Sequence, residues 1–113
     1  MASKNKTRLP KPQLFPWLLL LLRINPTYGY GLRQDLLGRG FDADPSSVYR
    51  CLREMDGQGL IASTWTDKSE GPPRRVYELT EAGVIELDRV AVEWQRNRNI
   101  QTGFLRAFMR ERM

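Results

Sequence analysis

The segment LFPWLLLLLRI, residues 14–24, limits more than any other how this chain can fold. Apolar side chains occupy every position from Trp17 to Leu22, so a helix here must be covered on nearly all sides. The unbroken run WLLLLL is far shorter than the ~20 residues that a membrane-spanning helix needs. We therefore expect a buried helix from about Gln13 or Pro16 to Ile24, which a partner subunit helps to cover.

The residues before this run imitate the basic region of a signal peptide. They include Lys4, Lys6, Arg8 and Lys11. However, Pro12 and Pro16 interrupt the pattern, and Arg23 closes the apolar run without a small-residue cleavage site. We expect residues 1–12 to form a flexible basic arm of a cytoplasmic protein that has no membrane partner.

Length and charge set broad limits on fold and partner. The chain has 113 residues, which suits one domain, or one domain with an appended element. A net charge of +5 favours an anionic partner, nucleic acid first, although an inert basic surface would have the same composition. Cys51 is the only cysteine, so the chain has no intramolecular disulfide. It is either a small core residue or a redox sensor.

The segment DADPSSVYRCLREMDGQGLI, residues 42–61, predicts a helix over 45–57. Asp44 is suited to cap it, Pro45 fits the first helical position, and Gly57 and Gly59 end it. The apolar positions that face the core are Val48, Leu52 and Met55. The opposite face carries Ser46, Arg50 and Arg53, with Ser47 beside them near the helix start.

The other predicted elements complete a recognisable order. A second helix covers 28–37, two strands cover 60–67 and 73–79, and a long helix follows Thr80, with a bend or break expected around 97–103. Three helices, a hairpin and a long helix are the order of a winged helix. We predict a mainly α fold with a small β-hairpin: a winged-helix DNA-binding domain over 13–79 and a C-terminal dimerisation helix over 80–113.

Three segments resemble a known family. PTYGYGLRQDL, DPSSVYRCLREMDGQGLI and GPPRRVYELTEAG are similar to successive signatures of PadR-type bacterial transcriptional regulators, over about Leu14 to Leu87. The WLLLLL helix and the wing sequence resemble the branch described as polyhydroxybutyrate-responsive repressors. The resemblance implies a homodimeric repressor that binds double-stranded DNA. In several members of the family, a flat pocket between the subunits binds an aromatic or hydrophobic effector. Ser46 and Ser47 replace a frequent Gly-Thr pair, and Cys51 a frequent Thr.

Residues of the third predicted helix are candidates for DNA contact. Arg50 could donate two hydrogen bonds to a guanine edge, and Ser47 lies where a helix start favours phosphate. The resemblance implies that the Tyr49 hydroxyl points to a phosphate. The alternative for Arg50 and Arg53 is a solvated face in which Arg50 pairs with Glu54. The candidates on this helix are Ser46, Ser47, Tyr49, Arg50 and Arg53.

The predicted wing adds Lys68, Arg74 and Arg75 to the DNA-contact candidates. Strand alternation places Arg74 and Arg75 on opposite faces, so only one faces DNA well and the other pairs with an acidic neighbour. Lys68, near the tip, suits a non-specific phosphate contact.

Aromatic residues suggest a second site. Trp94 is in helical register with Leu87 and Ala91, which predicts an interface position where a flat effector could also stack. For Trp17 and Trp94, the alternative to effector contact is packing in the core. For Tyr28 and Tyr30, the alternative to ligand contact is packing at the start of the second helix. The set for the dimer interface or effector is Trp17, Leu87, Ala91, Trp94, Leu105 and Phe108.

Catalysis finds little support in the sequence. The chain has no histidine, and a single cysteine without a histidine is not a credible nucleophile pair. We predict no catalytic residue, no metal site and no cofactor. Two rivals to the DNA-binding regulator are a winged-helix module for protein–protein contact and a small-molecule enzyme or carrier.

Overall fold

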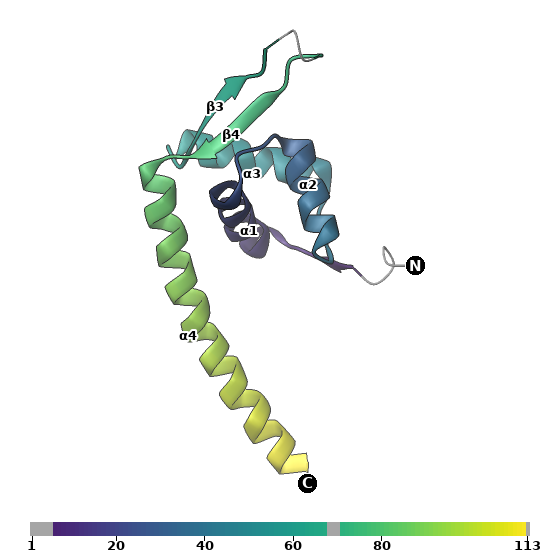
Figure 1. The fold of residues 1–113 in the computed structure, drawn as a ribbon. Coiled ribbons are helices and arrows are strands. Elements are labelled where there is room, and N and C mark those ends of the chain that lie inside the picture. Colours follow the sequence, from purple (N-terminus) through teal and green to yellow (C-terminus); the bar gives the residue numbers. More distant parts are fainter. Residues whose placement is uncertain (1–5, 68–70, 113) are drawn as a thin grey trace.

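A small helical domain carries a hairpin on one side and a long helix that leaves it (Figure 1). The computed structural model describes residues 6–67 and 71–112. Their elements are β1 (Thr7–Arg8), α1 (Lys11–Ile24), α2 (Gly29–Gly38), β2 (Phe41–Asp42), α3 (Pro45–Gly57), β3 (Ile61–Trp65), β4 (Arg75–Leu79) and α4 (Glu81–Arg112). This is the predicted winged-helix order with its long C-terminal helix.

Helix α1 forms the centre of the core and contacts α2, α3, α4 and β4. Its buried side chains are Leu14, Leu18, Leu19, Leu21 and Leu22. Within the run WLLLLLRI the apolar side chains left exposed are Leu20 and Ile24, at 36% and 56%. One chain therefore covers most of this helix, and the expected need for a partner is limited to that edge.

The N-terminal prediction was wrong for residues 7–12. Strand β1 pairs in parallel with β2, the Leu9 side chain is buried, and α1 already begins at Lys11. Pro10 caps this helix and Pro12 lies in its first turn, where a missing N–H is tolerated. The prolines that suggested a mobile arm thus begin a helix, and Leu9 anchors the segment. The predicted arm residue Lys4 lies outside the described residues.

Helices α2 and α3 form the helix-turn-helix, and α3 has the predicted bounds. The Asp44 side chain does not cap it, because its carboxylate forms an ion pair of 2.9 Å with Arg8. The helix ends before Gly59, whose φ of +74° lies in the left-handed region that glycine tolerates. This positive φ turns the chain into β3.

The wing is the antiparallel hairpin of β3 and β4, with a register from Ile61↔Leu79 to Trp65↔Arg75. Thr27 forms a bridge with Tyr77 through two backbone hydrogen bonds of 3.2 and 2.8 Å. The segment before α2 is therefore tied to the middle of β4 in the wing.

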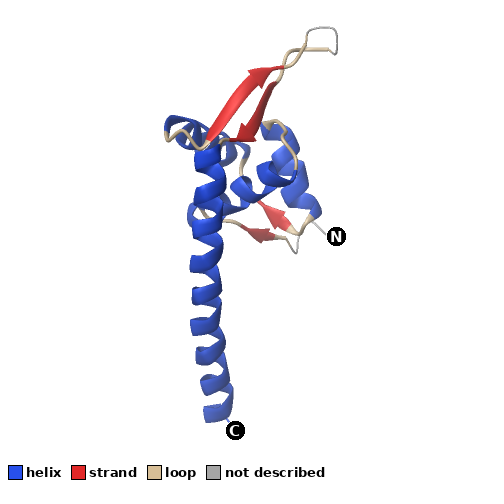
Figure 2. Ribbon diagram, turned by 60° about the vertical axis from the view of Figure 1, so that its left-hand side comes forward, coloured by secondary structure: helices blue, strands red, loops and turns tan. Residues whose placement is uncertain are grey.

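Helix α4 is continuous over 32 residues, so it does not break at 97–103. Thr80 caps it as predicted, because its Oγ1 accepts a hydrogen bond of 3.1 Å from the Gly83 N–H. The helix runs away from the domain (Figure 1 and Figure 2). Its exposed large apolar side chains include Ile85, Val92, Ile100, Phe104, Leu105, Phe108 and Met109. Within the described residues, no helix is long and apolar enough to span a membrane.

Candidate nucleic-acid interface

The outer face of α3 presents the predicted polar stripe. Ser46, Arg50 and Arg53 are exposed, whereas Val48, Leu52 and Met55 on the opposite face are at most 1% exposed. Arg50 Nη2 donates a hydrogen bond of 3.3 Å to Ser47 Oγ. The described part of the chain contains no ion pair of Arg50 or Arg53. Both guanidinium groups are therefore available to an external anion.

The alternative in which Arg50 pairs with Glu54 is wrong. Glu54 instead accepts a hydrogen bond of 3.1 Å from Lys11 Nζ at the start of α1. The two residues are 43 positions apart in sequence, so helical spacing alone could not reveal this partner.

Cys51 is a buried core residue of α3, with 3% of its surface exposed. Burial and, secondarily, the charge of Glu54 raise the pKa of its thiol. A protonated, buried thiol is a poor nucleophile, and this favours the predicted packing role over redox sensing.

The two wing arginines have different surroundings. The Arg74 guanidinium lies 4.7 Å from the Tyr28 ring centroid, and its Nη1 donates a hydrogen bond of 2.8 Å to the Tyr28 hydroxyl. Arg75 donates to Ser63 Oγ at 2.8 Å and pairs with Asp56 at 3.4 Å. Arg75 is thus the arginine with an acidic neighbour, as strand alternation predicted for one of the two. Lys68 lies outside the described residues.

An aromatic hollow of about 500 Å³ lies between the start of α2, α3 and the wing. It is lined by Tyr28, Gly29, Tyr30, Tyr49, Trp65, Pro73, Arg74, Arg75 and Tyr77. Tyr30 and Trp65 are 60% and 66% exposed. The Tyr49 ring lies directly against Gly29, so a Cβ at this position would force the exposed Tyr49 side chain to move.

Tyr28, Tyr30 and Trp65 line this hollow but were not among the predicted DNA-contact residues. The Tyr28 and Tyr30 rings stack with centroids 6.3 Å apart, so they do pack at the start of α2, and they also line the hollow. The sequence signal that could have identified Trp65 is a large aromatic residue at the end of the first predicted strand, near the hairpin loop. Its partner on the second strand, Arg75, is basic.

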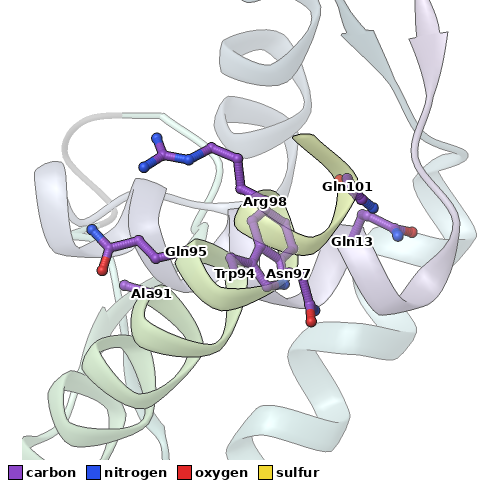
Figure 3. Close-up of a pocket in the computed structure, with 7 residues that line it drawn as sticks. All are labelled: Gln13, Ala91, Trp94, Gln95, Asn97, Arg98 and Gln101. Atoms are coloured by element: carbon purple, nitrogen blue, oxygen red, sulfur yellow. The ribbon is translucent and has the colours of Figure 1, made fainter. Parts of the chain in front are cut away.

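A second hollow, of about 420 Å³, lies beside Trp94 on α4 (Figure 3). It is lined by Gln13, Ala91, Trp94, Gln95, Asn97, Arg98 and Gln101. Leu87 is half-buried against the core, whereas Leu105 and Phe108 are exposed further along the helix. Trp17 packs on Phe41, with ring centroids 5.0 Å apart, at the edge of the core. Trp17 does not line this hollow.

Comparisons with known proteins identify the family. The sequence profile of the transcriptional regulator PadR-like family matches residues 18–89, more than half of the chain. The chain belongs to the PadR-like family. The chain is 35% identical over 71 residues to the transcriptional regulator Rv3488 of Mycobacterium tuberculosis. The match covers 61% of this chain and 65% of the relative.

Solved structures of PadR-like proteins share the winged-helix fold. A PadR family regulator from Eggerthella lenta is 30% identical, with a TM-score of 0.75, over 81% of this chain and 80% of that one. PadR of Bacillus subtilis, solved in complex with operator DNA, is 27% identical with a TM-score of 0.65. That match covers 74% of this chain and 49% of the Bacillus protein.

Proposed function

We propose that this chain represses transcription by binding double-stranded DNA with α3 in the major groove. The observation that carries the proposal is the exposed stripe of Ser46, Arg50 and Arg53, on which neither arginine pairs with a carboxylate of the described residues. A guanidinium in such a position can donate two hydrogen bonds to a guanine edge. The operator complex of the Bacillus relative supports this role for the shared fold.

The aromatic hollow beside the wing is the proposed contact for the DNA backbone. Tyr49 of α3 and Arg74 of the wing line it together, so one strand of DNA could meet both elements. Ser47 at the helix start and the tyrosine hydroxyls add hydrogen-bond partners for phosphate oxygens. Lys68, beyond the described residues, stays a proposed phosphate contact.

We also propose that the protein is a homodimer in which 13–79 binds DNA and 80–113 joins the subunits. The support is the row of exposed apolar side chains on α4, together with Leu20 and Ile24 of α1. A helix this long with so many exposed apolar groups gains stability from packing on a partner. The polar residues around Trp94 would interrupt that apolar seam.

The hollow beside Trp94 is the proposed effector site. A flat aromatic or hydrophobic compound would stack on the indole, and Arg98 and the neighbouring amides would bind its polar groups. The assignment to the polyhydroxybutyrate-responsive branch stays a proposal that rests on residues of α1 and the wing. The regulator is proposed to act in the cytoplasm, without catalysis.

Selection from a random duplex library tests the main proposal. The expected result is an enriched inverted repeat with half-sites about 34 Å apart, one helical turn. If about 6–10 phosphates are neutralised, affinity should fall about 10³- to 10⁵-fold between 50 and 200 mM salt. Enrichment of no sequence, with no binding at low salt, would favour the rival of a protein–protein module.

A further inference from the structure

The recognition helix and its N-cap residue, Asp44, together carry more negative than positive side chains. Residues 44–57 contain three carboxylates, those of Asp44, Glu54 and Asp56, and two arginines, so this segment has a formal charge of −1. Such a segment should repel DNA phosphates. Glu54 is one helical turn beyond Arg50, about 5–6 Å away between Cβ atoms, which is inside the screening length of about 8 Å at physiological salt.

Each of these carboxylates has a basic partner from outside α3. Arg8 Nη1 of β1 lies 2.9 Å from Asp44, and Lys11 Nζ lies 3.1 Å from Glu54. Arg75 Nη2 of the wing lies 3.4 Å from Asp56. With the three partners included, the formal charge of the cluster rises from −1 to +2.

The fold brings these cations to α3 from distant parts of the sequence. The parallel pairing of β1 with β2 sets Arg8 beside Asp42 and Asp44. Lys11 follows as the first residue of α1, and the hairpin register places Arg75 at the start of β4, opposite Trp65. Ion pairs as exposed as these add little to folding stability, so a role in the electric field around α3 accounts for them better.

We propose that Arg8, Lys11 and Arg75 neutralise the carboxylates of Asp44, Glu54 and Asp56, so that the α3 face with Arg50 and Arg53 approaches DNA without repulsion between these carboxylates and the phosphates. The proposal rests on the proposed function of α3. It makes Lys11 a positioning residue that acts through Glu54 and does not itself contact DNA.

The test compares Lys11→Ala, Glu54→Gln and the double variant on a duplex of about 30 base pairs enriched by the wild-type protein. Lys11→Ala should weaken binding about three- to tenfold, because Glu54 then repels phosphate. Glu54→Gln should bind as tightly as wild type or more tightly. The double variant should return to wild-type affinity and salt dependence, since the pair as a whole is neutral.

Other outcomes separate the rival explanations. A double variant as weak as Lys11→Ala, with a salt slope reduced by about one, would mean that Lys11 contacts a phosphate directly. Weaker binding by Glu54→Gln would mean that the pair only holds α1 against α3. Either result overturns the proposal while the wild-type protein still binds DNA. Absence of DNA binding by wild type would overturn the proposed function, and this inference with it.

The test also needs a control variant and a replacement in case Lys11→Ala does not fold. Arg89→Ala removes a cation that is also in exposed ion pairs, with Glu86 and Glu93, but on α4, and it should leave DNA affinity unchanged. If Lys11→Ala fails to fold by circular dichroism, the cycle of Arg8→Ala with Asp44→Asn replaces it. Asparagine removes the charge of Asp44 with little change in side-chain size, and the Asp44 side chain makes no capping hydrogen bond to lose, so the same three outcomes decide.

Discussion

Arg74 and Tyr28, 46 residues apart in sequence, join the wing to the start of α2. The guanidinium lies over the tyrosine ring and also donates a hydrogen bond of 2.8 Å to its hydroxyl. These contacts fix the position of a flexible cation before any ligand arrives, and a preorganised group loses less conformational entropy on binding. The Arg74 contact thus extends the candidate interface from α3 to the wing.

Arg74→Ala should weaken the binding of all duplexes alike, because Arg74 is expected to meet a phosphate and not a base. The slope of log affinity against log salt should fall by about one. Tyr28→Phe keeps the ring and removes only the hydroxyl, and it should cost less, about 1 kcal/mol or below. A loss confined to the selected sequence would instead mean that Arg74 reads a base. Titrations with selected and scrambled duplexes make the distinction.

Arg50→Ala should cost about 1–3 kcal/mol on the selected duplex and relax the preference at one base pair. Arg50→Lys is the matched control: it keeps the charge but cannot donate two hydrogen bonds in one plane, so preference at that base pair should still relax. Repeating the library selection with each variant measures this directly. If Arg50→Ala selects the same sequences as wild type, the polar face of α3 is only a solvated surface and does not read DNA.

The sequence predicted those parts of the fold whose signals are local. Helix α3 follows from Pro45, an apolar spacing and a glycine stop within one segment, and the Thr80 cap lies three residues from the N–H that it binds. The contacts between residues far apart in the sequence were not predicted. Leu9 is buried because β1 reaches β2, and neither the Lys11–Glu54 pair nor the Arg74–Tyr28 contact has a periodic signature.

Two glycines of α4 should respond to alanine in opposite directions. A Cβ at Gly83 would collide with the backbone carbonyl of Leu60, whereas a Cβ at Gly103 would meet open space. Gly83→Ala should therefore destabilise the fold by about 1–3 kcal/mol. Gly103→Ala should stabilise it by about 0.5–1 kcal/mol, since alanine favours a helix more than glycine does. Urea denaturation of both variants checks this; a Gly83→Ala protein as stable as wild type would contradict the close packing of α4 on the Leu60 backbone.

Leu105→Glu and Phe108→Glu should shift the protein from dimer to monomer. Both side chains are exposed in one chain, at 56% and 46%, and a carboxylate in an apolar interface is strongly unfavourable. Sedimentation at micromolar concentration should find a wild-type dimer. Arg110→Gln changes the charge by the same amount on another face of α4 and should stay dimeric. A wild-type monomer that is stable and fully folded would contradict the proposed dimer.

The effector proposal depends on Trp94, which is 37% exposed and lines the hollow on α4. Flat aromatic compounds should quench its fluorescence and release the protein from its duplex. The chain has three tryptophans, so the assignment needs variants: Trp94→Phe should lose the quenching and the release, whereas Trp65→Phe should keep the quenching.

Release requires more than tight binding at Trp94. A compound changes DNA affinity only if it binds one arrangement of the two recognition helices better than another, and the coupling must then be reciprocal. DNA should therefore weaken binding of the compound by the same factor by which the compound weakens binding of DNA. Titrating the compound in the presence and absence of the selected duplex measures both factors. Quenching of wild type without reciprocal weakening would leave Trp94 in a ligand site that has no part in regulation.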